Sequence, residues 1–337
     1  MSNFIIIGVC FLAGFVARHW GKFPPDSHRS LNAFIISISL PCLEFVPLRH
    51  AVLDGNFLVF SVMPWFLFGA SILFFSTLGK KFGWDESTKT CLYLSAGLGN
   101  TSFLGIPLVE AYYGKEGIPT AVVINQLGTF LALSLPGTYL GTRAMLRLKK
   151  ESESVNLFKR LFSFPPFWGL LIALASRPLV FPAALEQAIS RIGDTLTPLA
   201  LFSVGYQLPR VDKLNYSLLD AENPSGASSA PLVWGLVYKL LLGPFMVWFC
   251  FGSYYFFADP TFRQAQPTYL RDFKILVMEA GMAPMITGSL LAAEWGLKPR
   301  LAVSLVGIGI PLSFVTTMGL YYLLEKWAWI GTIFFGP

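Results

Sequence analysis

Long apolar runs separated by short polar connections dominate the chain. A membrane-spanning helix needs about 20 mostly apolar residues, and runs of that kind predict helices at roughly 3–20, 30–47, 57–79, 90–113, 118–143, 166–184, 189–208, 231–257, 272–295 and 300–324. The first run lacks a basic stretch before it, so we expect a first membrane helix and not a signal peptide. The pattern therefore predicts an all-α integral membrane protein with about ten transmembrane helices.

The fourth apolar run contains a stretch that should interrupt a membrane helix. Three glycines and a proline surround an Asn-Thr-Ser sequence within residues 96–108. Glycine adds backbone freedom, and proline removes a helical N–H group. Non-helical backbone inside a bilayer is tolerated only where protein buries it or water reaches it. We therefore predict an unwound helix and a functional site here, with the break held by Gly99, Gly105 and Pro107.

A polar stretch at 144–165, expected to be a cytoplasmic loop, divides the chain into halves at 1–143 and 166–337. With five spans on each side, the halves must have opposite orientations, so related halves would be inverted repeats. Prolines and glycines recur in matching helices of the two halves: Pro41 and Pro198, Pro64 and Gly243-Pro244, and the break at 96–108 with a second one at 279–288. Gly281 and Pro284 would hold that second break. Paired interrupted helices are the best sequence pointer to a transporter site.

Composition and charge agree with a membrane protein. Of the 337 residues, 54% are hydrophobic and 13% are charged, whereas soluble domains carry about 25% charged residues. The net charge of +6 arises from bases in short connections, which is typical of topology signals and not of a nucleic-acid-binding face. Lysine and arginine are more frequent in odd-numbered connections, which places both termini outside a cell (inner or plasma) membrane. A second polar stretch at 209–230 is expected to be an exposed loop.

Metal and enzyme chemistry have little support in the sequence. The four cysteines, Cys10, Cys42, Cys91 and Cys250, lie within apolar runs without metal-like spacing, and we expect small core residues instead of disulfides. The three histidines lie at helix ends or in loops. A membrane enzyme would need a nucleophile–base pair or a metal cluster, so we expect no enzyme, no metal and no cofactor.

The motif from Gly99 to Leu108, Gly-Asn-Thr-Ser-Phe-Leu-Gly-Ile-Pro-Leu, resembles that of the auxin efflux carrier family, which includes plant PIN-type carriers and bacterial dicarboxylate carriers. Leu40-Pro41, the 198–205 segment and Ala283-Pro284 extend the resemblance over essentially the whole chain. The short 144–165 connection resembles that of the bacterial members.

The resemblance implies a specific architecture, shared with bile-acid and sodium/proton carriers. It consists of two inverted five-helix repeats, with helices 4 and 9 crossing at their breaks. Helices 1, 2, 6 and 7 would form a scaffold that dimerises through helices 2 and 7. Helices 3–5 and 8–10 would form a moving transport domain.

Asn100, Thr101 and Ser102 are the first candidates for substrate binding, with Thr287 assisting from the second repeat. A half-helix that starts at a break presents unpaired N–H groups and roughly half a positive charge. The helix 4 break has no acidic side chain, so an anion would suit it. The alternative is that these short polar residues only satisfy backbone groups freed by the break.

Glu279 is the acidic residue nearest the second break and is our candidate for coupling to a proton or cation, because an ionisable residue in a bilayer is functional by default. Alternatively, it lies near the outer interface or pairs with Lys274 or Lys239. Lys239 itself is either an anion partner or a snorkelling side chain.

Asn125 and Gln126 lie in helix 5, where sodium/proton carriers of related shape place aspartates. This chain has amides there, which weakens a sodium/proton exchange mechanism and leaves the coupling ion open. Asn125 either binds substrate or makes an interhelical hydrogen bond.

Together these features predict a secondary transporter that moves small organic anions, carboxylates or auxin-like acids, by an elevator-type movement. The alternatives are a sodium-coupled symporter of the bile-acid type and, less favoured, a channel or receptor. The substrate and the coupling ion, proton or sodium, stay open.

Overall fold

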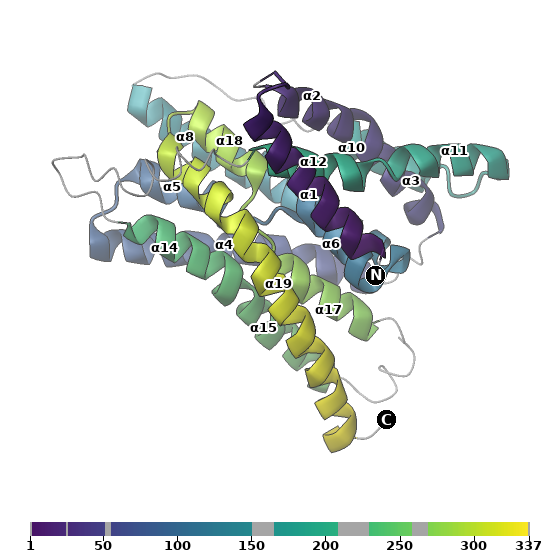
Figure 1. Ribbon diagram of the computed structural model, residues 1–337. Coiled ribbons are helices and arrows are strands. Elements are labelled where there is room, and N and C mark those ends of the chain that lie inside the picture. Colours follow the sequence, from purple (N-terminus) through teal and green to yellow (C-terminus); the bar gives the residue numbers. More distant parts are fainter. Residues whose placement is uncertain are drawn as a thin grey trace.

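The computed structural model describes residues 2–24, 26–50, 55–149, 165–207, 229–257 and 269–335. Within these ranges the elements are helices joined by turns, with one isolated β-bridge (Figure 1). Five helices of the described part of the chain are long and apolar enough to cross a membrane: Ser27–His50, Val59–Phe82, Lys115–Leu148, Ala230–Gly252 and Pro299–Lys326. An all-α membrane protein is thereby confirmed at the level of class. Most of the predicted loops at 144–165 and 209–230 lies outside the described residues.

One set of helices, which we call the first helix group, comes from the start of each half of the chain. Its members are α1 (Ser2–Trp20), α2 (Ser27–Phe34), the π-helical η1 (Ile35–Ser39), α3 (Leu40–His50), α10 (Pro165–Ala175), α11 (Ala183–Gly193) and α12 (Leu196–Gln207). Helix α1 packs along α12, and α10 and α11 pack along α3 (Figure 1). Gly14 of α1 and Gly205 of α12 allow the closest approach, because a Cβ atom at either would overlap the carbonyl of Phe202 or Phe11.

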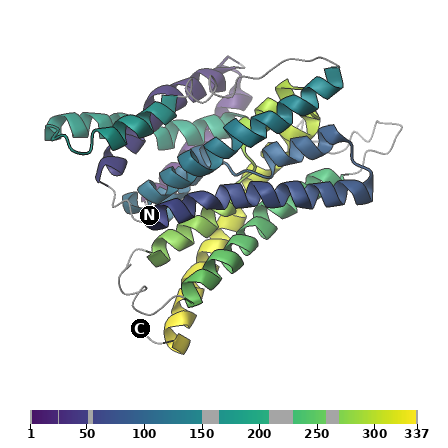
Figure 2. The same ribbon diagram turned by 180° about the vertical axis from the view of Figure 1, so that it is seen from behind.

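The remaining described helices form the second helix group, seen from behind in Figure 2. In the first half of the chain they are α4 (Gly55–Phe82), α5 (Glu86–Ser95), η2 (Thr101–Gly105), α6 (Ile106–Tyr113), η3 (Lys115–Gly117), α7 (Ile118–Val123), η4 (Ile124–Phe130), η5 (Leu133–Gly137) and α8 (Thr138–Lys149). In the second half they are α14 (Ala230–Val237), η6 (Tyr238–Leu242), α15 (Gly243–Phe257), α17 (Tyr269–Ala280), α18 (Ile286–Glu294) and α19 (Pro299–Phe335).

Two of the predicted spans differ from the structure. The helix expected at 166–184 ends at Ala175, and the span expected at 189–208 consists of α11 and α12, joined at Asp194 and Thr195. Pro178 and Pro182 explain the first difference, because proline lacks the N–H group that would continue a helix and disfavours helical geometry in the residue before it.

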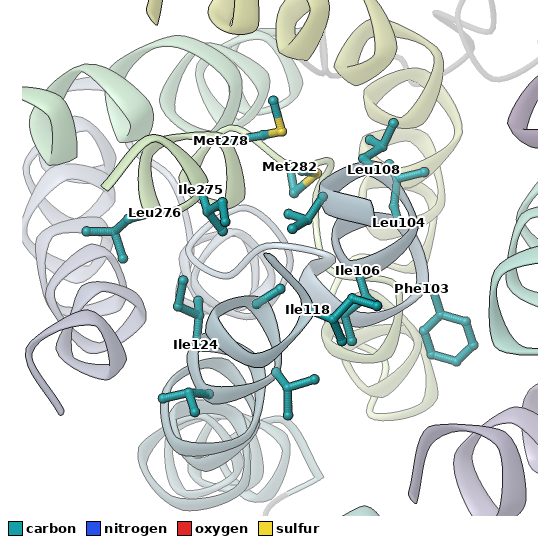
Figure 3. Packing of buried hydrophobic residues seen from close by; sticks show 14 of the residues in the cluster. Phe103, Leu104, Ile106, Leu108, Ile118, Ile124, Ile275, Leu276, Met278 and Met282 are labelled. Atoms are coloured by element: carbon teal, nitrogen blue, oxygen red, sulfur yellow. The ribbon is translucent and has the colours of Figure 1, made fainter. Parts of the chain in front are cut away.

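The helices expected at 90–113 and 272–295, which we continue to call helices 4 and 9, are interrupted as predicted, at 96–100 and 281–285. The apolar core encloses this region. Figure 3 shows Ile275, Met278 and Met282, from α17 and the turn after it, beside Leu104 and Leu108 of η2 and α6. These side chains are 2% exposed or less, so the interruptions lie deep in the protein.

Candidate functional site

The two interruptions lie side by side and run antiparallel. Gly99 and Pro284 form the isolated β-bridge. The Asn100 N–H donates to the Ala283 carbonyl at 2.9 Å, and the Met285 N–H donates to the Ser95 carbonyl at 2.9 Å. Each broken segment thus supplies some of the hydrogen bonds that the other lost on leaving the helix, which is how interrupted backbone becomes tolerable inside a membrane protein.

Helix ends of both polarities meet at this crossing. Helices α5 and α17 end here, and η2 and α18 begin here. The Gly105 N–H bonds back to the Asn100 carbonyl, and the Ser289 N–H bonds back to the Met285 carbonyl, both at 3.0 Å. The N–H groups of the intervening first turns have no carbonyl partner within their own helices. Such helix starts favour an anion.

Asn100 and Thr101 are both 2% exposed, and the structure gives them different tasks. The Thr101 hydroxyl donates to Oδ1 of Asn125 at 2.8 Å, so the interhelical hydrogen bond that we considered for Asn125 is present. The Asn100 Nδ2 group, in contrast, has no hydrogen-bond partner among the described residues. Gln126 is also buried, 1% exposed, and Ser102 is half-buried at the start of η2.

Glu279 lies in the last turn of α17 and is fully buried, with an exposure of 0%. Within the described part of the chain, neither carboxylate oxygen has a hydrogen-bond partner. The side chain is buried within the protein. The pairing with Lys274 that we considered is not present, because the Lys274 ammonium pairs with Glu325 at 2.9 Å.

Lys239 is buried beside Glu279 and does not snorkel. Its side chain is 2% exposed, and its ammonium group donates to the Ala280 carbonyl, at the end of α17, at 2.9 Å. The Lys239 and Glu279 charges act on each other electrostatically. A buried amino group and a buried carboxyl group therefore lie together at the crossing.

The glycines and prolines of the motif occupy different positions relative to the breaks. Gly99 and Pro284 lie in the non-helical segments, and Gly281 lies in the turn that ends α17. Gly105 has right-handed helical angles, φ −62° and ψ −57°, and Pro107 lies in the first turn of α6. Both therefore follow the first break instead of forming it.

Three hydroxyl residues lie near the breaks, two of them in α18 and one in η4. Thr287, which we predicted, is half-buried in the first turn of α18. Ser289, which we did not predict, is 4% exposed, and Thr129 of η4 is 1% exposed. The Ser289 and Thr129 hydroxyls have no hydrogen-bond partner among the described residues. A systematic list of hydroxyl residues inside apolar runs would have included both.

Helices interrupted inside a membrane protein, with amide and ionisable side chains at their meeting point, define a class of proteins that move solutes across membranes. A comparison with known families agrees, because the model of the family described as "Membrane transport protein" matches residues 1–321. The chain belongs to this family, the auxin efflux carrier family, and the family resemblance of the helix 4 motif is thereby confirmed.

Individual relatives cover nearly the whole chain at low identity. An uncharacterized transporter of Methanothermobacter thermautotrophicus is 25% identical over 311 residues, which are 91% of this chain and 93% of the relative. An uncharacterized transporter of Methanocaldococcus jannaschii is 22% identical over 347 residues, 98% of each chain. "Auxin efflux carrier component 8" of Arabidopsis thaliana is 21% identical over 382 residues, 96% of this chain and 97% of the relative.

Proposed function

We propose that the protein is a secondary carrier that moves small organic anions, either carboxylates or auxin-like acids, across the membrane. The observation that carries this proposal is the Asn100 amide, whose buried Nδ2 donor has no partner among the described residues where two helices start. A carboxylate supplies the acceptor that this donor lacks. The name of the Arabidopsis relative, an auxin efflux carrier component, supports an auxin-like acid as one candidate.

The charges at the crossing are consistent with an anionic substrate and a coupled proton. The Lys239 ammonium and the two helix starts favour negative charge, and Glu279 opposes it. Protonation of Glu279 would remove that opposition, so one proton bound there would favour one substrate carboxylate. We therefore propose Glu279 as the coupling residue, with Asn100, Thr101, Ser102, Asn125, Gln126 and Thr287 around the substrate.

The packing of the first helix group supports an inverted-repeat arrangement. Helix α1 packs on α12 as α10 packs on α3, and α2 packs on α12 as α11 packs on α3. If each helix is replaced by its counterpart in the other half (α1 by α10, α2 by α11 and α3 by α12), the same packed pairs result. We propose that the repeats at 1–143 and 166–337 give ten spans. The first group would be the scaffold, dimerising through α2–α3 and α11–α12, and the second group would move as an elevator.

The experiment that tests this function is a thermal-shift panel of monocarboxylic and dicarboxylic acids, including indole-3-acetate, on the purified protein. It would be run at several pH values, with and without sodium, and followed by flux measurements in proteoliposomes. We expect stabilisation and flux with at least one organic acid. Sodium-dependent stabilisation would favour the bile-acid type of symport instead. If every acid fails in both assays, the proposal is wrong.

Replacing Asn100 by alanine tests the site itself. We expect Asn100→Ala to abolish the thermal shift with the acid, because the donor aimed at the carboxylate is gone, while the protein without ligand keeps its melting temperature within a few degrees. Gln187→Ala, at an exposed position of α11, is the matched control and should bind normally. Normal flux by Asn100→Ala would refute the site.

A further inference from the structure

The conformation of Gly105 does not explain why this residue is a glycine. Its φ of −62° and ψ of −57° lie in the right-handed helical region, which alanine adopts without strain. Glycine inside a helix is destabilising relative to alanine. Gly105 therefore serves some purpose other than backbone freedom.

The space beside Gly105 is occupied by the carboxyl group of Glu279. A Cβ atom built at position 105 would overlap Oε2 of Glu279 and would lie 2.6 Å from Oε1 and 2.8 Å from Cδ. Real Cβ atoms do not approach other atoms so closely. Glu279 is fully buried and its oxygens have no hydrogen-bond partner among the described residues, so its carboxyl group lies packed against the bare backbone of Gly105.

Gly99 stands in the same relation to Lys239. A Cβ atom at position 99 would lie 2.8 Å from the Lys239 ammonium nitrogen and 3.3 Å from the backbone oxygen of Glu279. The Lys239 ammonium is held in this place by the Ala280 carbonyl at 2.9 Å. Two glycines of one motif thus make room for two ionisable side chains that come from two other helices, η6 and α17.

We infer that Gly105 is a positioning residue for Glu279: its missing side chain is the space that the carboxyl group occupies, and Gly99 provides the equivalent space for the Lys239 ammonium. The part of this inference that concerns transport rests on the proposed function. The part that concerns the position of the carboxyl group does not. Both glycines thus make room for ionisable side chains of η6 and α17, whereas only Gly99 lies in the first break itself.

A double-mutant cycle between Gly105 and Glu279 tests the positioning without any substrate. We expect Gly105→Ala to lower the melting temperature of the purified protein by several degrees, because the methyl group and the carboxyl group compete for one space. In an E279A background the same change should leave the melting temperature unchanged or raise it, because the methyl group fills the space left by the carboxyl group. If Gly105→Ala alone does not fold, recovery of folding in the double variant is the expected result.

Gly69→Ala is the matched control for this cycle. Gly69 also lies inside a helix, α4, but a Cβ atom there would meet nothing within 4 Å. We expect the control to leave the melting temperature unchanged or slightly raised in both backgrounds. An equal loss from Gly105→Ala with and without the Glu279 carboxyl group would overturn the inference.

A second measurement separates positioning from packing. The flux of the acid identified in the panel is measured against pH for Gly105→Ala and for Gly69→Ala. Among the described residues, the charged group acting on Glu279 is Lys239, which both variants retain. We expect Gly105→Ala to shift the pH profile, because the carboxyl group has moved relative to Lys239, and Gly69→Ala to keep the original profile. A reduced flux with an unchanged profile would indicate packing alone and would refute the positioning role.

If no acid in the panel is transported, the proposed function is wrong. The double-mutant cycle measured by thermal unfolding then remains as the test of the positioning.

Discussion

Some polar side chains at the crossing are hydrogen-bonded to each other, and others have no hydrogen-bond partner among the described residues. Thr101 and Asn125 form a closed pair across 24 positions of sequence, so they hold η2 and η4 together. The Asn100 Nδ2 and the Glu279 oxygens have no partner among the described residues. Because an unpaired buried polar atom costs about 1–3 kcal/mol, these groups are the ones that a substrate or proton would stabilise.

Replacing Glu279 by glutamine tests its coupling role. Glutamine keeps the size of the side chain and remains neutral at every pH, so we expect the pH dependence of flux to flatten in Glu279→Gln. Proteoliposome flux measured at a series of pH values would show it. Glu116→Gln, at a carboxylate that is 86% exposed, should keep the original profile. A variant Glu279→Gln with normal pH dependence would exclude the role.

At the scale of elements, helix starts are fixed by local chemistry. Asp85 is the N-cap of α5, with its carboxylate accepting from the Thr88 N–H at 2.8 Å. The same carboxylate pairs with the Lys298 ammonium at 2.8 Å, just before α19 starts. One side chain therefore caps the first half of broken helix 4 and joins it to the start of α19.

The pKa of Asp85 reflects these contacts. Burial by itself would raise the pKa of this carboxyl group, but the hydrogen bonds from Lys298 and Thr88 outweigh burial and lower the pKa below its ordinary value. Because the pKa is lower in the folded than in the unfolded protein, the stabilisation is present above the unfolded value, near pH 4, and is lost as the pH falls through the folded value.

Two substitutions at Asp85 separate the cap from the charge. We expect Asp85→Ala to lower the free energy of unfolding by about 1 kcal/mol, the usual effect of losing an N-cap. Asp85→Asn keeps a capping side chain and loses the ion pair, so its deficit should be smaller than that of Asp85→Ala at pH 7 and should shrink further at about pH 3, below the unfolded pKa. Thermal unfolding in detergent at the two pH values would measure this. A deficit of Asp85→Asn that is independent of pH would contradict the assignment.

At the scale of the whole molecule, two polar contacts join the helix groups beside their shared apolar packing. The Lys115 ammonium of η3 pairs with Asp194 at 2.9 Å, and the Thr197 hydroxyl of α12 donates to Glu110 of α6 at 3.0 Å. Both contacts join the end of the broken helix 4 to the junction between α11 and α12. An elevator movement would have to separate them in each cycle.

Cross-linking across this contact tests the movement. In a background without Cys10, Cys42, Cys91 and Cys250, we expect a short reversible cross-link between cysteines placed at 115 and 194 to stop flux, and reduction to restore it. A cross-link between cysteines at 85 and 298, both within the second helix group, is the control and should leave flux intact. Undiminished flux with the 115–194 link closed would rule out an elevator movement at this contact.

The orientation of the chain follows from its basic residues and is a separate prediction. We expect both termini outside the cytoplasm, because lysine and arginine are more frequent in the odd-numbered connections. Alkaline phosphatase fused at either end should therefore be active, and a cytoplasmic reporter fused at the same ends should be inactive. A cytoplasmic N-terminus would show that the charge bias was misinterpreted.

The amino-acid sequence by itself was sufficient for the class of protein and for the location of both breaks. Long apolar runs predict membrane helices because a bilayer accepts only apolar segments of that length. Glycine and proline affect the backbone within about a turn of their own position, so the interruptions at 96–100 and 281–285 could be located from nearby residues. The end of α10 at Ala175 also has a local cause, Pro178 and Pro182, but it was missed because hydropathy alone did not divide the apolar run that contains them.

Only the tertiary structure determined which polar side chains are hydrogen-bonded and to which groups. Sequence left Asn125 between binding and hydrogen bonding, and Lys239 between an anion partner and snorkelling. The structure pairs Asn125 with Thr101 and directs Lys239 to the Ala280 carbonyl. It also brings Gly105 against Glu279, 174 positions further along the chain. Contacts of this kind depend on how whole helices cross, and they cannot be predicted from neighbouring residues in the sequence. The role inferred for Gly105 therefore depends on a carboxyl group that only the tertiary structure brings next to it.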